Sequence, residues 1–377
     1  METIQKNKEI CFVIDQLEFF ISHRLMLIRY LSSFTEVVIL TNLSKFGEIQ
    51  HDLNGVKLVH LGSRPSKFNI LSQLNYLKNI SKLTNKYGKN GIFYITLEKC
   101  FFGALLNIFN TKRINFFVIS GIGQVLFPNN RVFHLKTIVC KIIFRLSNLK
   151  NNTTYIFQNS SNKNLFFKQK LVTNNNSLII QGNGIDEERF FPNKHAKHKI
   201  AKFIYTGRIE RDKGILELIE ALECLIATNK EFNFTFIGSL DKEDCLLRRK
   251  FYEVLVNENI SHVENIKHSD IHKYYKQANI FMMPSHGEGL TASGIEALAC
   301  GNALIMSDVA GCKELVVDSK NGFVHKVKDP YSIFECMEKL VDNIPLTFKM
   351  GIESRNIYER YFKNEKIFLA YKSLINF

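Results

Sequence analysis

The chain has 377 residues, of which 45% are hydrophobic and 12% aromatic, enough for two domains of ordinary size with apolar cores. Six prolines and twenty glycines exclude a low-complexity or fibrous chain. The eight cysteines are scattered and form no C-x-x-C pair, which argues against a zinc site and for a reducing compartment.

The net charge of +14 is concentrated in the first half of the chain. Residues 1–180 hold 23 Lys and Arg against 8 Asp and Glu, whereas residues 181–377 hold 27 against 28. No acidic residue occurs between Glu98 and Asp186. This asymmetry indicates an anionic partner: nucleic acid, an anionic membrane face or a phosphorylated lipid. The alternative is a basic surface that reflects a coding bias toward Lys and Asn.

Strand-like apolar runs alternate with helical stretches along the whole chain. In the first half the expected strands are residues 10–14, 36–41, 56–61, 92–96, 115–120, 155–158 and 178–181. In the second half they are residues 202–206, 232–238, 262–264, 280–283, 303–307 and 322–325. Most are continuous apolar runs, as expected for strands buried on both faces of parallel sheets. The predicted fold class is therefore α/β.

A domain boundary is predicted near residue 180, where the charge balance changes and Gly182-Asn183-Gly184 forms a turn. We expect domains over residues 1–180 and 181–353. The last segment, 354–377, is expected to form an aromatic-rich helix that packs back on the first domain. We expect no signal peptide, and the longest apolar run, residues 100–109, is about half the length needed to span a bilayer.

Residues 132–150 are expected to form a helix with two faces. One stripe, expected to face the core, is apolar: Leu135, Ile138, Val139, Ile142, Leu146 and Leu149. The opposite face is basic and carries two phenylalanines: Phe133, His134, Lys136, Lys141, Phe144 and Arg145. A basic face with exposed phenylalanines is typical of an interfacial membrane helix, and a plain solvated face is the alternative.

The most informative stretch follows the expected strand 280–283. Pro284 and the glycines of 287–289 break the chain, and a helix begins near Ala292. Such a strand, glycine turn and helix start present free backbone N–H groups to an anion, most often a phosphate. Glu288 lies in the turn and Glu296 in the helix, where two carboxylates would suit the hydroxyl groups of a sugar or ribose.

A second motif, Gly207-Arg208-x(4)-Lys213-Gly214, lies between the expected strand 202–206 and a helix over 215–228. Arg208 and Lys213 are thus expected at the carboxyl edge of a sheet, where open α/β folds bind ligands. Two cations beside a helix N-terminus suit a diphosphate, and a solvated basic turn is the alternative. No D-x-D pair occurs in a suitable loop, so no metal is expected.

The order of these elements, from Gly182-Asn183-Gly184-Ile185-Asp186 to the Glu288–Glu296 helix, resembles the GT-B glycosyltransferases of retaining family 4, also called group 1. The likeness covers nearly the whole second half and implies two Rossmann-like domains facing a cleft. It implies a nucleoside diphosphate sugar, with UDP-sugar expected, as the donor substrate, and no cofactor or metal. The leaving diphosphate would help to take the acceptor proton.

By this resemblance Arg208 and Lys213 neutralise the diphosphate, Glu288 contacts the transferred sugar, and Glu296 binds the ribose. The expected catalytic residues are Glu288, Arg208 and Lys213. The expected donor-binding residues are Gly207, Arg208, Lys213, Gly287, Glu288, Gly289, Leu290, Thr291 and Glu296. Gly294 departs from the family pattern, and we expect it to weaken its helix by about 1 kcal/mol relative to Ala and to change the room around the donor base.

Segments 19–25, 96–99 and 120–127 resemble bacterial glycosyltransferases that build polysaccharide or O-antigen repeat units on a polyprenyl-diphosphate carrier. The acceptor-side candidates that follow are His23, Arg24, Lys99, Gly121 and Gly123. The alternatives are a structural cap or surface residue for His23, a snorkelling lysine for Lys99, and a structural turn for the glycines. The expected location is the cytoplasm, peripheral on the inner face of a bacterial cell membrane.

Two other functions remain open on sequence alone. A GT-B epimerase or hydrolase of nucleotide sugars would not need a basic, aromatic first domain. A nucleic-acid-binding protein would explain the charge, but no recognised binding motif accompanies the basic residues, so no nucleic acid is expected. The expected partners are a nucleotide-sugar donor, a polyprenyl-diphosphate-linked acceptor and an anionic membrane surface.

Overall fold

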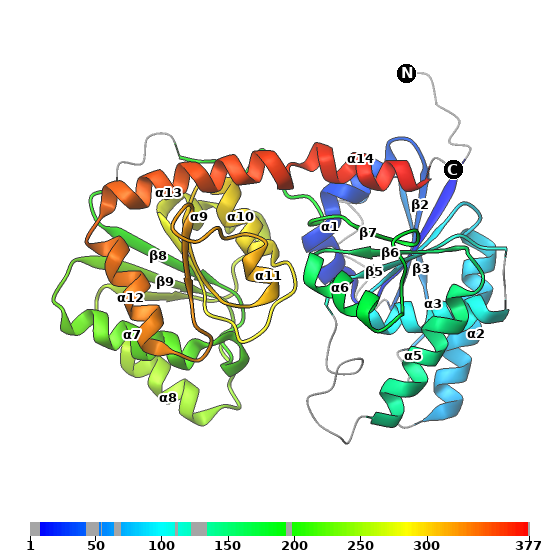
Figure 1. Ribbon diagram of the computed structural model, residues 1–377, viewed down its shortest axis with the longest axis horizontal. Coiled ribbons are helices and arrows are strands. Elements are labelled where there is room, and N and C mark those ends of the chain that lie inside the picture. The colour runs from blue at the N-terminus through cyan, green and yellow to red at the C-terminus, as the bar shows by residue number, and fades with distance from the viewer. Residues whose placement is uncertain are drawn as a thin grey trace. The chain divides into compact units, whose positions relative to one another are not determined.

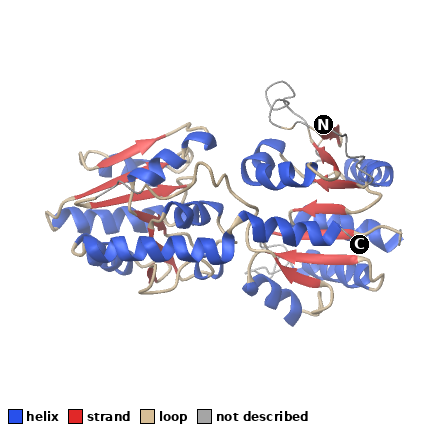
Figure 2. Cartoon of the chain, turned by 90° about the horizontal axis from the view of Figure 1, so that it is seen from above, coloured by secondary structure: helices blue, strands red, loops and turns tan. Residues whose placement is uncertain are grey.

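A computed structural model describes residues 8–42, 53, 55–63, 69–109, 112–121, 134–193 and 198–375. The chain divides into two compact units: unit 1 comprises Met1–Gly184 with Asn364–Phe377, and unit 2 comprises Ile185–Lys363. Each unit is a parallel sheet covered by helices on both faces (Figures 1 and 2). The predicted α/β class with two Rossmann-like domains is confirmed, and the cleft between them stays a prediction.

The sheet of unit 1 has the strand order β3-β2-β1-β4-β5-β6-β7, and every pair is parallel. The strands are β1 (Glu9–Val13), β2 (Glu36–Thr41), β3 (Val56–His60), β4 (Ile92–Ile95), β5 (Asn115–Ile119), β6 (Thr153–Phe157) and β7 (Ser177–Ile179). The order reverses between β1 and β4, which makes their carboxyl ends the topological switch point of this sheet.

Two separate cores cover the two faces of this sheet. One face packs against α1 (Leu17–Ser32) and α14 (Asn364–Ile375) through residues such as Leu27 and Tyr371. The other face packs against α2 (Ile70–Tyr87), α3 (Leu97–Phe109), α5 (His134–Asn148) and α6 (Ser160–Lys168). Alternate residues of each buried strand feed the two cores, which is why the strands are apolar throughout.

The last helix belongs to unit 1, although the chain reaches it through unit 2. The predicted start of the final segment, residue 354, falls inside α13 (Ile344–Ile357), which a π-helical turn over Tyr358–Phe362 follows. The chain returns to unit 1 at Asn364. There the ring of Phe368 stacks on Tyr30 of α1 at 5.0 Å between centroids, and α14 lies along α1 (Figure 1).

Unit 2 repeats the arrangement with the order β10-β9-β8-β11-β12-β13, reversing between β8 and β11. Its strands are β8 (Ala201–Thr206), β9 (Phe232–Ile237), β10 (Ile260–Val263), β11 (Ile280–Met283), β12 (Ala303–Ser307) and β13 (Gly322–His325). One face is covered by α7 (Ile215–Ala227), α8 (Cys245–Val254) and α12 (Pro330–Val341). The other is covered by α9 (His272–Gln277), α10 (Ala292–Cys300) and α11 (Ala310–Lys313).

The predicted helix over 132–150 is α5, but the face that packs on the core is not the expected one. Phe144 is 1% exposed, and its ring packs 6.2 Å from the rings of Phe117 and Tyr155. The expected core stripe is exposed at Ile138, Val139, Ile142, Leu146 and Leu149. Phe133 and the side chains of residues 134–136 lie outside the described residues. The ring of Phe144 therefore fills the space beside β5 and β6 that the aliphatic stripe was expected to fill.

No helix in the described part of the chain is both long and apolar enough to cross a bilayer.

Candidate functional site

The two motifs of unit 2 follow the two strands at its switch point. β8 and β11 pair in parallel, with Phe203 opposite Ile280 and Tyr205 opposite Met282. Gly207 and Arg208 follow β8 and lead through the 3-10 turn Arg211–Lys213 into α7. Residues 284–291 follow β11 and lead into α10. Both loops therefore lie at the carboxyl edge of the sheet, where open α/β folds bind ligands.

Close backbone contact makes these two loops one structural unit. Gly214 adopts φ +70°, and a Cβ added there would lie 2.0 Å from the carbonyl oxygen of Pro284. The amide of His286 donates to the carbonyl of Asp212 at 2.9 Å. The hydroxyl of Ser285 donates to the same carbonyl at 3.2 Å. Only glycine fits at position 214, because of both its left-handed backbone and the neighbouring carbonyl.

Lys213 and Glu288 meet across the two loops. Lys213 Nζ lies 2.7 Å from Glu288 Oε1, and the two side chains are 19% and 16% exposed. The pair is largely buried but still reached by water. Arg208 is 64% exposed and holds Glu210 at 2.5 Å. Both cations of this loop are thus paired with a carboxylate, and Arg208 is the more exposed of the two.

The turn around Glu288 presents unused amides. Gly311 of α11 packs so closely on Gly289 that an added Cβ would lie 1.7 Å from the Gly289 carbonyl oxygen, which holds this turn in place. Among the hydrogen bonds between described residues, none uses the amides of Gly289, Leu290 or Thr291 as donors. These amides lead into the start of α10, and together they suit an anion such as a phosphate.

Glu296 is buried inside α10 and paired with a histidine that sequence reasoning missed. His268 Nε2 lies 2.7 Å from Glu296 Oε1, and the glutamate side chain is 5% exposed. Burial alone would lower the pKa of His268, but the hydrogen bond and charge of Glu296 raise it above its usual value. His268 comes from a short turn after β10. Nothing in the sequence spacing links it to Glu296, because the contact depends on strand order.

His286 is a second histidine whose role the sequence motif does not reveal. Its Nε2 lies 3.0 Å from Glu217 Oε1 at the start of α7. This bond adds a side-chain contact to the backbone contacts that hold the two loops together.

Gly294 has a packing role that the sequence did not reveal. A Cβ added there would lie 2.4 Å from Leu315 Cδ1 and 3.2 Å from Met306 Cε. The room beside this glycine is therefore filled by the protein's own core, and the expected change in the space around the donor base stays a prediction. Close approach of α10 to Leu315 explains why glycine stands here.

In unit 1, Lys99 lies at the corresponding switch point. Its side chain is fully buried, and Nζ lies 2.8 Å from Asp15 Oδ1 and 3.5 Å from Glu98 Oε1. Burial would lower the pKa of Lys99, but Tyr76 and Asp15 raise it above its usual value. Asp15 follows β1 and Lys99 follows β4, with Thr96 between β4 and α3 at φ +84°. Asp15, 21% exposed, is a residue that sequence reasoning missed.

The other acceptor-side candidates have different surroundings. His23 lies on α1, with Nδ1 2.7 Å from the hydroxyl of Ser22. Arg24 is 4% exposed and donates to the hydroxyl of Tyr371 on α14 at 3.3 Å. The side chain of Arg24 is thus buried under α14, and its acceptor-side role stays a prediction. Gly121 follows β5 and is exposed, and Gly123 lies outside the described residues.

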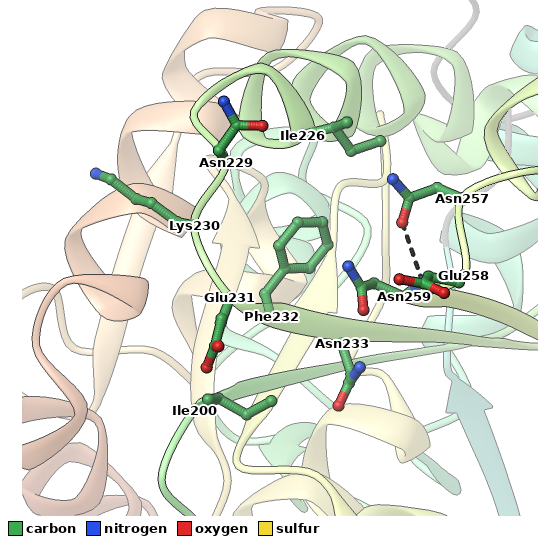
Figure 3. A pocket seen from close by; sticks show the side chains of 10 residues that line it. All are labelled: Ile200, Ile226, Asn229, Lys230, Glu231, Phe232, Asn233, Asn257, Glu258 and Asn259. Carbon is green, nitrogen blue, oxygen red and sulfur yellow. Dashed lines mark hydrogen bonds between the residues drawn. The ribbon is translucent and has the colours of Figure 1, made fainter.

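A cavity of about 420 Å³ lies at the opposite edge of the unit 2 sheet (Figure 3). It is formed where α7 ends and where β9 and β10 begin, and its lining includes the amides of Asn229, Asn257 and Asn259. Asn259 donates its backbone amide to Asn257 Oδ1 at 3.0 Å. The cavity shares no residue with the Lys213–Glu288 loops and lies at the amino ends of the strands. Nowhere in the described ranges do three His, Cys, Asp or Glu residues gather as a metal site.

Comparison with known proteins decides what unit 2 is. The pattern of the family described as "Glycosyl transferases group 1" matches residues 186–357, almost all of this unit. Unit 2 is a glycosyl transferase group 1 domain. All the donor-side residues predicted above lie within the matched range of this group 1 domain.

Two relatives are named as bacterial glycosyltransferases. The chain is 29% identical over 225 residues to the capsular polysaccharide biosynthesis glycosyltransferase CapM of Staphylococcus aureus, covering 55% of this chain and 59% of the relative. It is 24% identical over 327 residues to the N,N'-diacetylbacillosaminyl-diphospho-undecaprenol alpha-1,3-N-acetylgalactosaminyltransferase of Campylobacter jejuni, covering 84% of each. The chain thus spans little more than half of the first relative and most of the second.

Solved structures share the whole architecture. Sucrose-phosphate synthase from Thermosynechococcus elongatus superposes with a TM-score of 0.77 at 17% identity, over 97% of this chain and 98% of that one. HepE from Anabaena, solved in complex with UDP, superposes with a TM-score of 0.74 at 15% identity, over 97% and 98%. At these identities the likeness shows the fold, which is GT-B.

Proposed function

We propose that this chain is a retaining glycosyltransferase that moves a sugar from a nucleoside diphosphate to a hydroxyl of a lipid-linked saccharide. One observation carries the proposal: Lys213 and Glu288 touch at the switch point of a group 1 domain, with Arg208 on the same loop. Cations beside a carboxylate at one sheet edge suit a molecule that joins a diphosphate to a sugar.

The donor would be held by residues of both loops. Lys213 and Arg208 neutralise the diphosphate, and Glu288 accepts hydrogen bonds from hydroxyls of the transferred sugar. Glu296, oriented by His268, accepts from the ribose, and the amides of Gly289 to Thr291 bind the distal phosphate. UDP is the proposed nucleotide, since the HepE structures of the same fold hold UDP and UDP-glucose.

The reaction we propose proceeds on one face of the sugar. The acceptor hydroxyl attacks the anomeric carbon as the bond to the diphosphate breaks, and a diphosphate oxygen takes the hydroxyl proton. Negative charge builds on the leaving diphosphate, where fixed cations stabilise it without reorganisation. Lys213 and Arg208 supply that charge, so the proposal includes no metal and no cofactor.

The acceptor and the place of action rest on the first half of the chain. The name of the Campylobacter relative specifies an undecaprenol diphosphate-linked acceptor, and its match extends over most of this chain. The acid-free stretch between Glu98 and Asp186 suits a phosphorylated lipid and an anionic surface. We therefore propose surface polysaccharide or O-antigen biosynthesis, peripheral on the cytoplasmic face of the cell membrane.

The deciding experiment supplies nucleotide sugars together with polyprenyl-diphosphate-linked saccharides and follows both the glycosylated product and the released nucleoside diphosphate. We expect transfer from a UDP-sugar, with the anomeric configuration of the donor kept in the product. Arg208→Ala should lower kcat/KM about 100-fold, and Arg249→Ala, an exposed arginine on α8, serves as its control. Release of nucleotide without transfer would contradict the proposal and indicate a hydrolase or epimerase.

A further inference from the structure

Four aliphatic side chains of α5, and Leu149 directly after its end, are exposed along one stripe: Ile138, Val139, Ile142, Leu146 and Leu149. Their exposed fractions run from 43% for Leu146 to 75% for Leu149. A single exposed aliphatic residue is ordinary, but a row along one helix face is typical of an interaction surface. We call these five residues the α5 ridge.

The opposite face of α5 anchors the helix without help from the α5 ridge. Phe144 fills the core beneath the sheet, and Ser147 is fully buried. The amide of Asn107 on α3 donates to the hydroxyl of Ser147 at 3.0 Å. The α5 ridge residues are not among those that form the described cores of unit 1, so polar side chains there should cost the fold less than in a core.

Cations lie beside the α5 ridge. With roughly 100° between successive residues of a helix, Arg145 falls at one margin of the stripe. The exposed Lys150 follows Leu149 directly after the helix ends. Lys141 lies beyond Arg145, and both reach Gln169 at the end of α6, at 2.9 Å each. That end of α6 adds the exposed side chains of Phe167, Lys168 and Lys170.

The chain segment that contains the α5 ridge has no acidic residue. No acidic residue occurs between Glu98 and Asp186, a stretch that includes all of α5 and α6. A second copy of this surface would bring its own cations against these, so a symmetric dimer is disfavoured. An anionic lipid surface complements both the apolar stripe and its cationic margins.

We propose that the α5 ridge inserts into the boundary of an anionic bilayer, with the aliphatic side chains among the upper acyl groups and the flanking cations at lipid phosphates. This geometry is that of an interfacial helix, which lies in the membrane plane. This inference rests on the proposed function, which supplies the bilayer as the partner, because a lipid-linked acceptor is embedded in such a surface. It assigns the contact to the aliphatic face of α5, opposite to Phe144.

The test is sedimentation of the full chain with vesicles, with no donor or acceptor added. One set of vesicles contains phosphatidylcholine alone, and the other also contains phosphatidylglycerol. The chain should bind the anionic vesicles, and binding should weaken as salt increases. The variant Ile142→Asp with Leu149→Asp should lose roughly tenfold or more in vesicle affinity. Val256→Asp, at an 86% exposed valine of unit 2, is the matched control and should bind as the native chain does.

Unchanged vesicle binding by the α5 variant would overturn the inference. So would a native dimer that the variant converts to a monomer, since the α5 ridge would then join two copies. Titration of UDP with the same proteins separates this inference from the proposed function. If UDP binds and sugar is transferred but vesicles are not bound, the inference alone fails. If vesicle binding depends on the α5 ridge while no sugar is transferred, the inference stands and the proposed function fails.

Discussion

Lys213 Nζ lies 2.7 Å from Glu288 Oε1, and this ion pair joins the loops after the two strands at which the unit 2 sheet reverses. Unit 1 repeats the relationship, with Lys99 Nζ 2.8 Å from Asp15 Oδ1 across the loops after β1 and β4. The burial differs: water reaches both partners in unit 2, whereas Lys99 is fully buried. Both partners in unit 2 are thus open to a ligand, as the proposed function requires, whereas in unit 1 only Asp15 is open to water.

Substitution of either partner of the Lys213–Glu288 pair should lower activity. Lys213→Ala should lower kcat/KM about 100-fold, because one preorganised contact to developing charge is worth about 3 kcal/mol. Glu288→Gln should lower kcat while leaving the affinity for UDP nearly unchanged, because in the proposed function Glu288 contacts the sugar. Steady-state rates and UDP titration measure both effects. Lys320→Ala, an exposed lysine elsewhere in unit 2, is the control, and an equal loss there would contradict the assignment.

Gly214→Ala should destabilise the chain by about 2 kcal/mol, since the new Cβ meets both a positive φ and the carbonyl of Pro284. Gly287→Ala is the matched comparison in the neighbouring loop, because no atom lies within 4 Å of an added Cβ there. Its stability should stay within about 0.5 kcal/mol of the native chain. Urea unfolding measures both, and equal stability of the two variants would show that the loop contact is unimportant.

His268 predicts a pH-dependent stability. Its pKa in the folded chain is raised above the usual 6.5, so pairing with Glu296 stabilises the fold fully below that pH. This contribution should disappear as the pH rises through the raised folded pKa. The stability difference between the native chain and His268→Gln should therefore be largest near pH 5.5 and shrink toward pH 8.5. Urea unfolding across this range measures it, and a difference independent of pH would argue against the charged pair.

The Asp15–Lys99 pair predicts an asymmetry between two substitutions. Asp15→Asn leaves the buried ammonium with Glu98, at 3.5 Å, as its carboxylate partner among the described residues, and should cost about 3 kcal/mol. Lys99→Met replaces the ammonium with an apolar chain of similar length and leaves a carboxylate that water can reach, so it should cost less. Unfolding free energies decide the order. A greater loss for Lys99→Met would mean that packing around Tyr76 and Phe102 matters more than charge.

Much of the fold could be predicted because buried parallel strands are apolar on both faces. Each strand expected from an apolar run is present, with ends that move by no more than two residues. The turns after β8 and β11 were predicted equally well, since their glycines, Arg208, Lys213 and Glu288 are close in sequence to those strands. Local order along the chain was enough for these features.

Local order along the chain could not predict contacts between residues that are far apart in the sequence. His268 meets Glu296, and Asp15 meets Lys99, only because strand order brings separate loops to one sheet edge. Arg24 looked like a binding residue beside His23, but the returning helix α14 buries it beneath Tyr371. No short pattern in the sequence specifies which strands become neighbours.

The sequence by itself determined the two α/β halves, the donor-side loops and the basic character of the first half. Periodicity also determined that α5 has two faces. Only the tertiary structure decided which face is buried: Phe144 fills the core beside Tyr155, and Ile142 with its neighbours faces solvent. The physical reason is that a helix face is chosen by the shape of the space it must fill, and that shape is made by other strands and helices.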